Sequence, residues 1–171
     1  MVMRSVSASG TMRMMGLVLA LWLSAYGGGH AQGLAPFQKL AGQWSGSGTI
    51  ELSNSTQEPI RCRAAYDVLE QQSNLQLNIR CASESYSFDL RASATYAAGA
   101  ITGTWSESTR NAAGTISGKA DGDRFQVVAK GPAFTAILTL VTRGNRQSVT
   151  IQSQDEKTRV KGASIALQRG S

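Results

Sequence analysis

The sequence predicts an all-β fold: a single antiparallel up-and-down barrel of about 8–10 short strands, preceded by a short N-terminal helical turn. Short segments with alternating apolar and polar residues recur about every ten residues, bounded by Gly, Asn, Asp or Pro, with no long helical period among them. In addition, residues 60–69 and 74–82 can pair as a hairpin that brings Cys62 opposite Cys81. A two-sheet β-sandwich is the alternative arrangement of the same strands.

The elements follow in order along the chain. Residues 35–41 can form one helical turn, with Phe37 and Leu40 facing the core. A first strand at about 43–53 and a turn at 54–59 lead into the hairpin. Alternation and turn residues then predict further strands around 86–90, 101–105, 116–120, 124–130, 133–141, 147–153 and 158–167.

One register of the hairpin aligns its apolar residues and both thiols. It pairs Val68 with Leu75, Tyr66 with Leu77, Ala64 with Ile79 and Cys62 with Cys81. Because side chains alternate across a strand, these residues share the inward face, and Arg61, Arg63 and Arg80 face outward. We therefore predict a structural disulfide between Cys62 and Cys81.

Residues 1–31 carry the basic, apolar and small-residue zones of a secretory signal. Arg4 and Arg13 precede an apolar run from 14 to about 26, and Gly29 and Ala31 fit the small-x-small cleavage rule. An uncleaved anchor is the alternative, but about 13 apolar residues fall short of the roughly 20 that span a bilayer. We predict a cleaved signal peptide, a single domain at 32–171, no membrane span after cleavage, and a periplasmic or secreted location.

Composition excludes several kinds of catalytic site. The sole histidine, His30, lies in the predicted signal peptide, so the mature chain has no imidazole for a nucleophilic triad or a zinc site. The acidic pairs Asp121 with Asp123 and Asp155 with Glu156 lie where turns are expected, which favours turn chemistry over calcium binding. We expect no enzyme activity, no cofactor and no metal.

Two carboxylates remain for an enzyme hypothesis. Glu107 shares the inward phase of Trp105, and Glu70 that of Val68. An unpaired acid facing the core has a raised pKa, the property of many catalytic carboxyls. Both residues lie at strand ends, where solvent is expected, and this favours a non-enzymatic protein.

The mature chain carries a net charge of about +4, spread over many positions. Scattered charge favours a solvated barrel exterior over an anion-binding surface. Nucleic acid is not an expected partner, because the chain is predicted to be exported and carries no nucleic-acid-binding motif.

The sequence leaves open whether the barrel is filled. An eight-stranded barrel can be packed solid or hold one small ligand. Inward-phase glycines at 46, 48, 103 and 118 indicate either sharp bending or room left open. The side chains expected to contact a ligand are Trp44, Tyr66, Leu77, Tyr86, Phe88, Trp105, Phe125 and Phe134.

The segment from Phe37 to Trp44 resembles the start of a lipocalin or a related calycin barrel. In lipocalins a short helical turn leads into a Gly-x-Trp motif whose Trp closes the barrel floor, and Gly42-Gln43-Trp44 occupies that place. The resemblance implies a basic residue on the last strand that stacks over this Trp, with Arg159, Lys161 and Arg169 as candidates.

These features favour an exported, non-enzymatic envelope protein that binds a small apolar or amphipathic ligand inside a calycin-like barrel. The alternative is a structural or inhibitory protein-interaction module with a fully packed barrel, which acts on an envelope protein through its loops.

Overall fold

The computed structural model describes residues 36–69, 73–132 and 134–170; the predicted signal peptide, His30 and Glu70 lie outside them. One 3-10 helix, η1 (Pro36–Leu40), precedes ten strands in the described chain. These are β1 (Gly42–Leu52), β2 (Gln57–Leu69), β3 (Asn74–Ala82), β4 (Ser87–Ala97), β5 (Ala100–Glu107), β6 (Ala112–Asp121), β7 (Arg124–Gly131), β8 (Phe134–Arg143), β9 (Arg146–Ser153) and β10 (Val160–Arg169).

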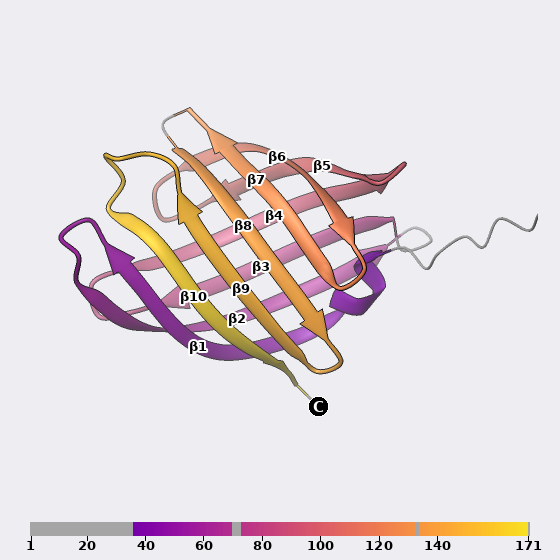
Figure 1. Ribbon diagram of the computed structural model, residues 1–171, viewed down its shortest axis with the longest axis horizontal. Helices are drawn as coiled ribbons and strands as arrows, with labels where there is room; N and C mark the ends of the chain where they lie inside the picture. Colours follow the sequence, from indigo (N-terminus) through magenta and orange to yellow (C-terminus); the bar gives the residue numbers. More distant parts are fainter. Residues whose placement is uncertain (1–35, 70–72, 133, 171) are drawn as a thin grey trace, which may run out of the picture. The chain divides into compact units, whose positions relative to one another are not determined.

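The strands form one closed barrel in which each strand pairs with its neighbours along the chain and β1 pairs antiparallel with β10 (Figure 1). The predicted up-and-down barrel is therefore confirmed, and the sandwich is not formed. Closure leaves neither end strand with an unpaired edge. Among the described residues, no helix has the length and apolar character that crossing a membrane requires.

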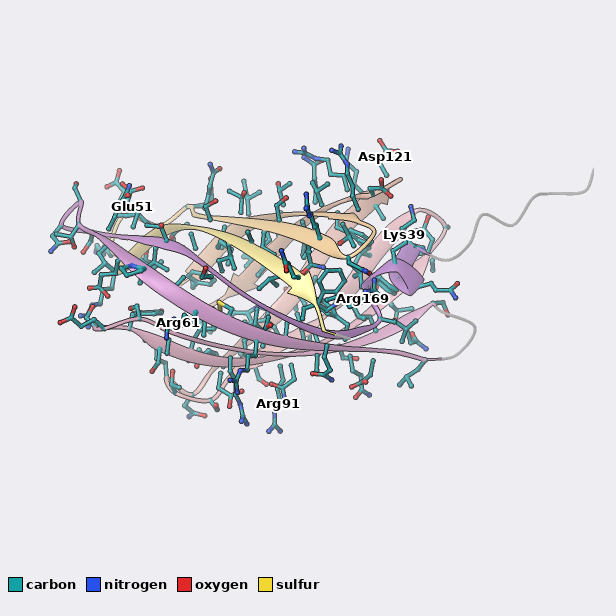
Figure 2. The ribbon with its side chains drawn as sticks, turned by 90° about the horizontal axis from the view of Figure 1, so that it is seen from below. Lys39, Glu51, Arg61, Arg91, Asp121 and Arg169 are labelled. Carbon is teal, nitrogen blue, oxygen red and sulfur yellow. A yellow bond between two sulfur atoms is a disulfide. The ribbon has the colours of Figure 1, made fainter. Side chains whose placement is uncertain are left out.

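Strands β2 and β3 pair in the predicted register, with Cys62 opposite Cys81 and joined to it by a disulfide. The two cysteines are only 3% and 4% exposed, so the bridge lies inside the barrel. Arg61, Arg63 and Arg80 are exposed on the outer face, as predicted, and Figure 2 shows Arg61 projecting from it.

Strands β1 and β10 approach each other closely where β1 carries inward-phase glycines. A Cβ added at Gly46 would lie 2.0 Å from the carbonyl oxygen of Ala166, and one at Gly48 would lie 2.0 Å from that of Ser164. On other strands, a Cβ added at Gly103 would lie 2.1 Å from the carbonyl oxygen of Ser93, and one at Gly118 would lie 2.2 Å from that of Gln126. At these four positions a neighbouring strand leaves no space for a side chain, so the interpretation that the glycines leave room open is wrong.

Candidate functional site

The end of the barrel beside η1 is filled by aromatic side chains. Phe37 packs against Tyr96 and Phe125, with ring centroids 6.3 and 6.2 Å apart. Trp44 is 2% exposed and donates a hydrogen bond from Nε1 to the carbonyl oxygen of Leu40 at 2.7 Å. We call this end the closed end.

Arg169 is the basic residue that stacks over Trp44, with its guanidinium carbon 4.6 Å from the ring centroid. Its Nη1 and Nη2 donate to the carbonyl oxygens of Ala41 and Lys39 at 2.7 and 2.6 Å. Figure 2 shows Arg169 beside Lys39 of η1. The other two candidates, Arg159 and Lys161, lie at the far end of β10.

A buried chain of hydrogen bonds also crosses the closed end. The Tyr66 hydroxyl donates to Oε1 of Gln147 at 2.9 Å, and Nε2 of Gln147 donates to Oγ1 of Thr142 at 3.0 Å. Burial raises the pKa of Tyr66, and the hydrogen bond with Gln147 offsets only part of that rise. The phenol stays neutral, and it is buried together with Phe37 and Trp44 at the closed end.

A cavity of about 420 Å³ occupies the opposite end of the barrel; we call it the open-end cavity. Its walls come from β1 and from β4 to β10, together with residues just outside these strands. The apolar lining consists of Ile50, Tyr86, Phe88, Leu90, Trp105, Ala112, Ala129, Phe134, Ala136, Leu138, Ile151, Val160 and Ala163, with Gly162 beside them. The polar lining consists of Glu107, Arg110, Ser153, Thr158, Arg159 and Lys161.

Inward-facing alanines make the room for this cavity. Ala129 of β7 lies directly opposite Ala136 of β8, and Ala163 of β10 lies opposite Ile50 of β1. A methyl group at these positions leaves space that a Leu or Phe would fill. None of the four glycines discussed above lines the cavity.

The structure brings four of the eight predicted ligand contacts together at the open-end cavity. These are Tyr86, Phe88, Trp105 and Phe134. Tyr86 packs edge-on against Phe88 and Trp105 against Phe134, with centroids 6.3 and 6.0 Å apart. Their contact with a ligand stays a prediction.

The other four predicted contacts lie away from the cavity. Trp44, Tyr66 and Phe125 belong to the closed end, as described above. Leu77 instead borders a hollow of about 390 Å³ whose other lining residues are mainly polar, among them Asp67, Gln76 and Arg91. Figure 2 shows Arg91 on the outside of the barrel.

The inward phase of Glu107 is predicted from the sequence, whereas the alanines of the site are not, and Arg159 and Lys161 were considered only as partners of Trp44. The alanines carried a usable signal, because they occupy the inward phase near one end of their strands. Lys161 carried none: it lies at an irregularity where Glu51 pairs with Gly162 and Leu52 with Val160. An irregularity of this kind changes which side chains reach the interior, and alternation alone does not reveal it.

Glu107 is 8% exposed, and its carboxylate organises the β5–β6 turn. Oε1 accepts hydrogen bonds from the backbone N–H groups of Asp89 and Thr109, both at 3.0 Å, and from the Thr109 hydroxyl at 2.6 Å. Oε2 accepts one from the backbone N–H of Arg110 at 2.9 Å and one from its Nη1 at 3.4 Å. Burial raises the pKa of Glu107, but the hydrogen bonds from Thr109, Asp89 and Arg110 outweigh it and hold the pKa below its ordinary value of 4.5.

We expect Glu107→Gln to destabilise the protein by about 1–3 kcal/mol at pH 7, because an amide cannot accept all of these bonds. A lowered folded-state pKa stabilises the fold above the unfolded-state pKa, and this contribution is lost as pH falls through the folded value. Urea unfolding should therefore show the difference between wild type and variant shrinking below about pH 4.5. The exposed Glu51→Gln serves as the control, and a difference that grows with acid would contradict this account.

The acidic pairs lie at the predicted connections, Asp121 and Asp123 at the β6–β7 turn and Asp155 and Glu156 between β9 and β10, and one member of each pair contacts another part of the chain. Asp123 forms an ion pair with Lys39 of η1 at 2.5 Å, and an Asp155 carboxylate oxygen accepts a hydrogen bond from the backbone N–H of Thr135. No group of three or more His, Cys, Asp or Glu side chains suited to a metal ion occurs within the described parts of the chain.

Solved structures with a similar architecture include the following two. Rv2717c from M. tuberculosis has a TM-score of 0.63 and 11% identity, and the match covers 80% of this chain and 98% of that one. The S-type phycobiliprotein lyase CPES from Guillardia theta has a TM-score of 0.55 and 12% identity, with 79% and 90% covered. These likenesses and the closed barrel fit a calycin-like fold. No known family matches the sequence, and no curated protein does.

Proposed function

We propose that this protein is an exported, non-enzymatic binder of a small apolar or amphipathic molecule, which it holds in the open-end cavity. The observation that carries the proposal is a cavity of about 420 Å³ with a mostly apolar lining, within the range of roughly 300–1,000 Å³ typical of small-molecule sites. Transfer of a ligand's apolar surface from water into such a cavity is favourable by about 25 cal/mol per Å².

Other observations support parts of this proposal. A disulfide persists in oxidising compartments, which favours export. The carboxylate of Glu107 is occupied with hydrogen bonds from its own turn, which favours a structural role for the acid nearest the cavity. The likeness to a phycobiliprotein lyase is compatible with a ligand inside the barrel. The alternative, an interaction module with a fully packed barrel, is less favoured, because the open-end cavity leaves part of the barrel interior unfilled.

Tryptophan fluorescence tests the proposal, because Trp105 lines the cavity whereas Trp44 is buried at the closed end. Titration of the mature protein with long-chain alcohols, fatty acids, quinones, tetrapyrroles and hopanoid-like lipids should give a saturable change with at least one class. In Ala163→Phe the new ring would project into the cavity from β10. We expect this variant to weaken binding about tenfold or more, which corresponds to 1.4 kcal/mol per factor of ten.

Ala166→Phe is the matched control, because Ala166 is exposed on the outer face of the same strand. It should bind as wild type does. The proposal fails if no compound class gives saturable binding, or if both phenylalanine variants bind as well as wild type.

A further inference from the structure

We infer that the ligand is an amphipathic anion, whose apolar body fills the open-end cavity and whose carboxylate-type head is held at the mouth by Arg159. This inference rests on the proposed function and adds the chemical class of the ligand. It comes from the charges of the lining, where three cations, Arg110, Arg159 and Lys161, accompany a single carboxylate, Glu107.

Two of the three cations already have partners in the protein. Arg110 lies over the Tyr86 ring, 4.0 Å from its centroid, and its Nη1 donates to the carbonyl oxygen of Ser87 at 3.0 Å. Lys161 donates from Nζ to the carbonyl oxygens of Asp155 and Glu156. Both therefore help to fix the loops around the mouth.

Arg159 differs from them. Its backbone carbonyl accepts a hydrogen bond from Ser53 at 2.8 Å, but its guanidinium makes no hydrogen bond or ion pair with any described residue. The charge of Arg159 helps to lower the pKa of the nearby Glu58, but the two form no ion pair, and the Glu58 carboxylate accepts hydrogen bonds from the Ser83 and Ser85 hydroxyls at 2.7 and 2.5 Å. The donors of Arg159 thus remain available at the edge of an apolar cavity.

The aromatic wall lies within reach of this charge. Burial raises the pKa of Tyr86, while the charges of Arg110 and Arg159 oppose that rise, so both guanidinium groups act on the same ring. An elongated molecule with its chain against Phe88 and Leu138 would place its head group near these cations. A carboxylate suits the site, because a guanidinium can donate two parallel hydrogen bonds to it.

Decanoate and decan-1-ol provide the test, because they share a ten-carbon chain and differ in the charge of the head. Isothermal titration calorimetry at pH 7 compares wild type with Arg159→Gln, and Arg61→Gln controls for net charge from the outer face. We expect wild type and Arg61→Gln to bind decanoate about tenfold or more tightly than the alcohol, as charge-assisted hydrogen bonds predict. In Arg159→Gln this preference should disappear while the affinity for the alcohol stays unchanged.

The outcomes separate the two proposals. Equal affinities of wild type for acid and alcohol, or a preference that persists in Arg159→Gln, overturn the inference and leave cavity binding standing. If neither compound, nor any compound of the wider panel, binds the wild type, the proposed function fails and the inference with it. Thermal unfolding of Arg159→Gln should stay close to wild type, because the guanidinium makes no hydrogen bond or ion pair with a described residue and acts on Tyr86 and Glu58 through its charge alone. Arg159→Lys keeps the charge but not the paired donors, and we expect it to show an intermediate preference for the acid.

Discussion

Replacing Gly48 with alanine is expected to destabilise the barrel by at least about 3 kcal/mol, at the upper end of the cost of overpacking. The new Cβ would lie 2.0 Å from the carbonyl oxygen of Ser164 and 2.6 Å from the Cα of Ile165. Both are backbone atoms, so no side-chain rotation relieves the contact, and β1 and β10 must separate. These strands form the pair that closes the barrel, and their separation would expose two sheet edges.

Urea unfolding and amide hydrogen exchange measure this effect. Gly48→Ala should lower the unfolding midpoint strongly and increase exchange first in β1 and β10. Ser47→Ala, on the outer face of the same strand, should stay within about 0.5 kcal/mol of wild type. An alanine at position 48 that leaves both stability and exchange unchanged would show that the strands can move apart at no cost.

The same glycine shows where sequence reasoning stops. Alternation places Gly48 on the inward face, because a strand has a period of two. It does not tell how near the next strand passes, since that distance depends on how tightly the closed sheet coils. From the sequence alone, Gly48 is therefore equally consistent with a sharp bend and with open space inside the barrel. The cavity exists, but alanines such as Ala129 and Ala136 create it.

Much of the fold could be predicted because local rules determine it. Turn residues delimit the strands, and the hairpin register follows from the apolar residues and cysteines that must share one face. The contact between Arg169 and Trp44 needed the structure, because three basic residues near the last strand satisfied the same expectation. Which of the three residues stacks over Trp44 depends on which end of β10 lies beside η1. Barrel closure determines this, and a local sequence pattern does not predict it.

The candidate site was harder to predict than the fold for a related reason. Inward-phase aromatic residues were predicted to contact the ligand, yet Trp44 and Tyr66 fill the closed end, and four other aromatic residues surround the cavity. The two groups lie at different heights along the barrel axis. Strand alternation predicts which side chains face inward, but it does not predict at which end of the barrel they lie. Arg159 and Lys161 lie near the β9–β10 connection, where strand alternation gives no direction for a side chain.

Removal of the disulfide by the double substitution Cys62→Ala and Cys81→Ala is expected to lower the free energy of unfolding by about 3 kcal/mol. The bond links residues separated by 19 positions, and on the chain-entropy model a loop of this size restricts the unfolded chain by roughly that amount. Alanine suits the experiment better than serine, because both positions are buried and a serine hydroxyl there would need a new partner. Urea unfolding of the oxidised wild type, the reduced wild type and the double variant measures the effect.

The double variant should keep its ligand affinity wherever it remains folded. Strands β2 and β3 contribute no residue to the open-end cavity within the described chain, so the bridge acts on the stability of the barrel and not on its binding surface. Reduced wild type should behave like the double variant, and reductant should not change the stability of the double variant at all. Equal unfolding midpoints for oxidised and reduced wild type would contradict the entropic role of the bond. A folded double variant that no longer binds would instead place β2 and β3 in the ligand site.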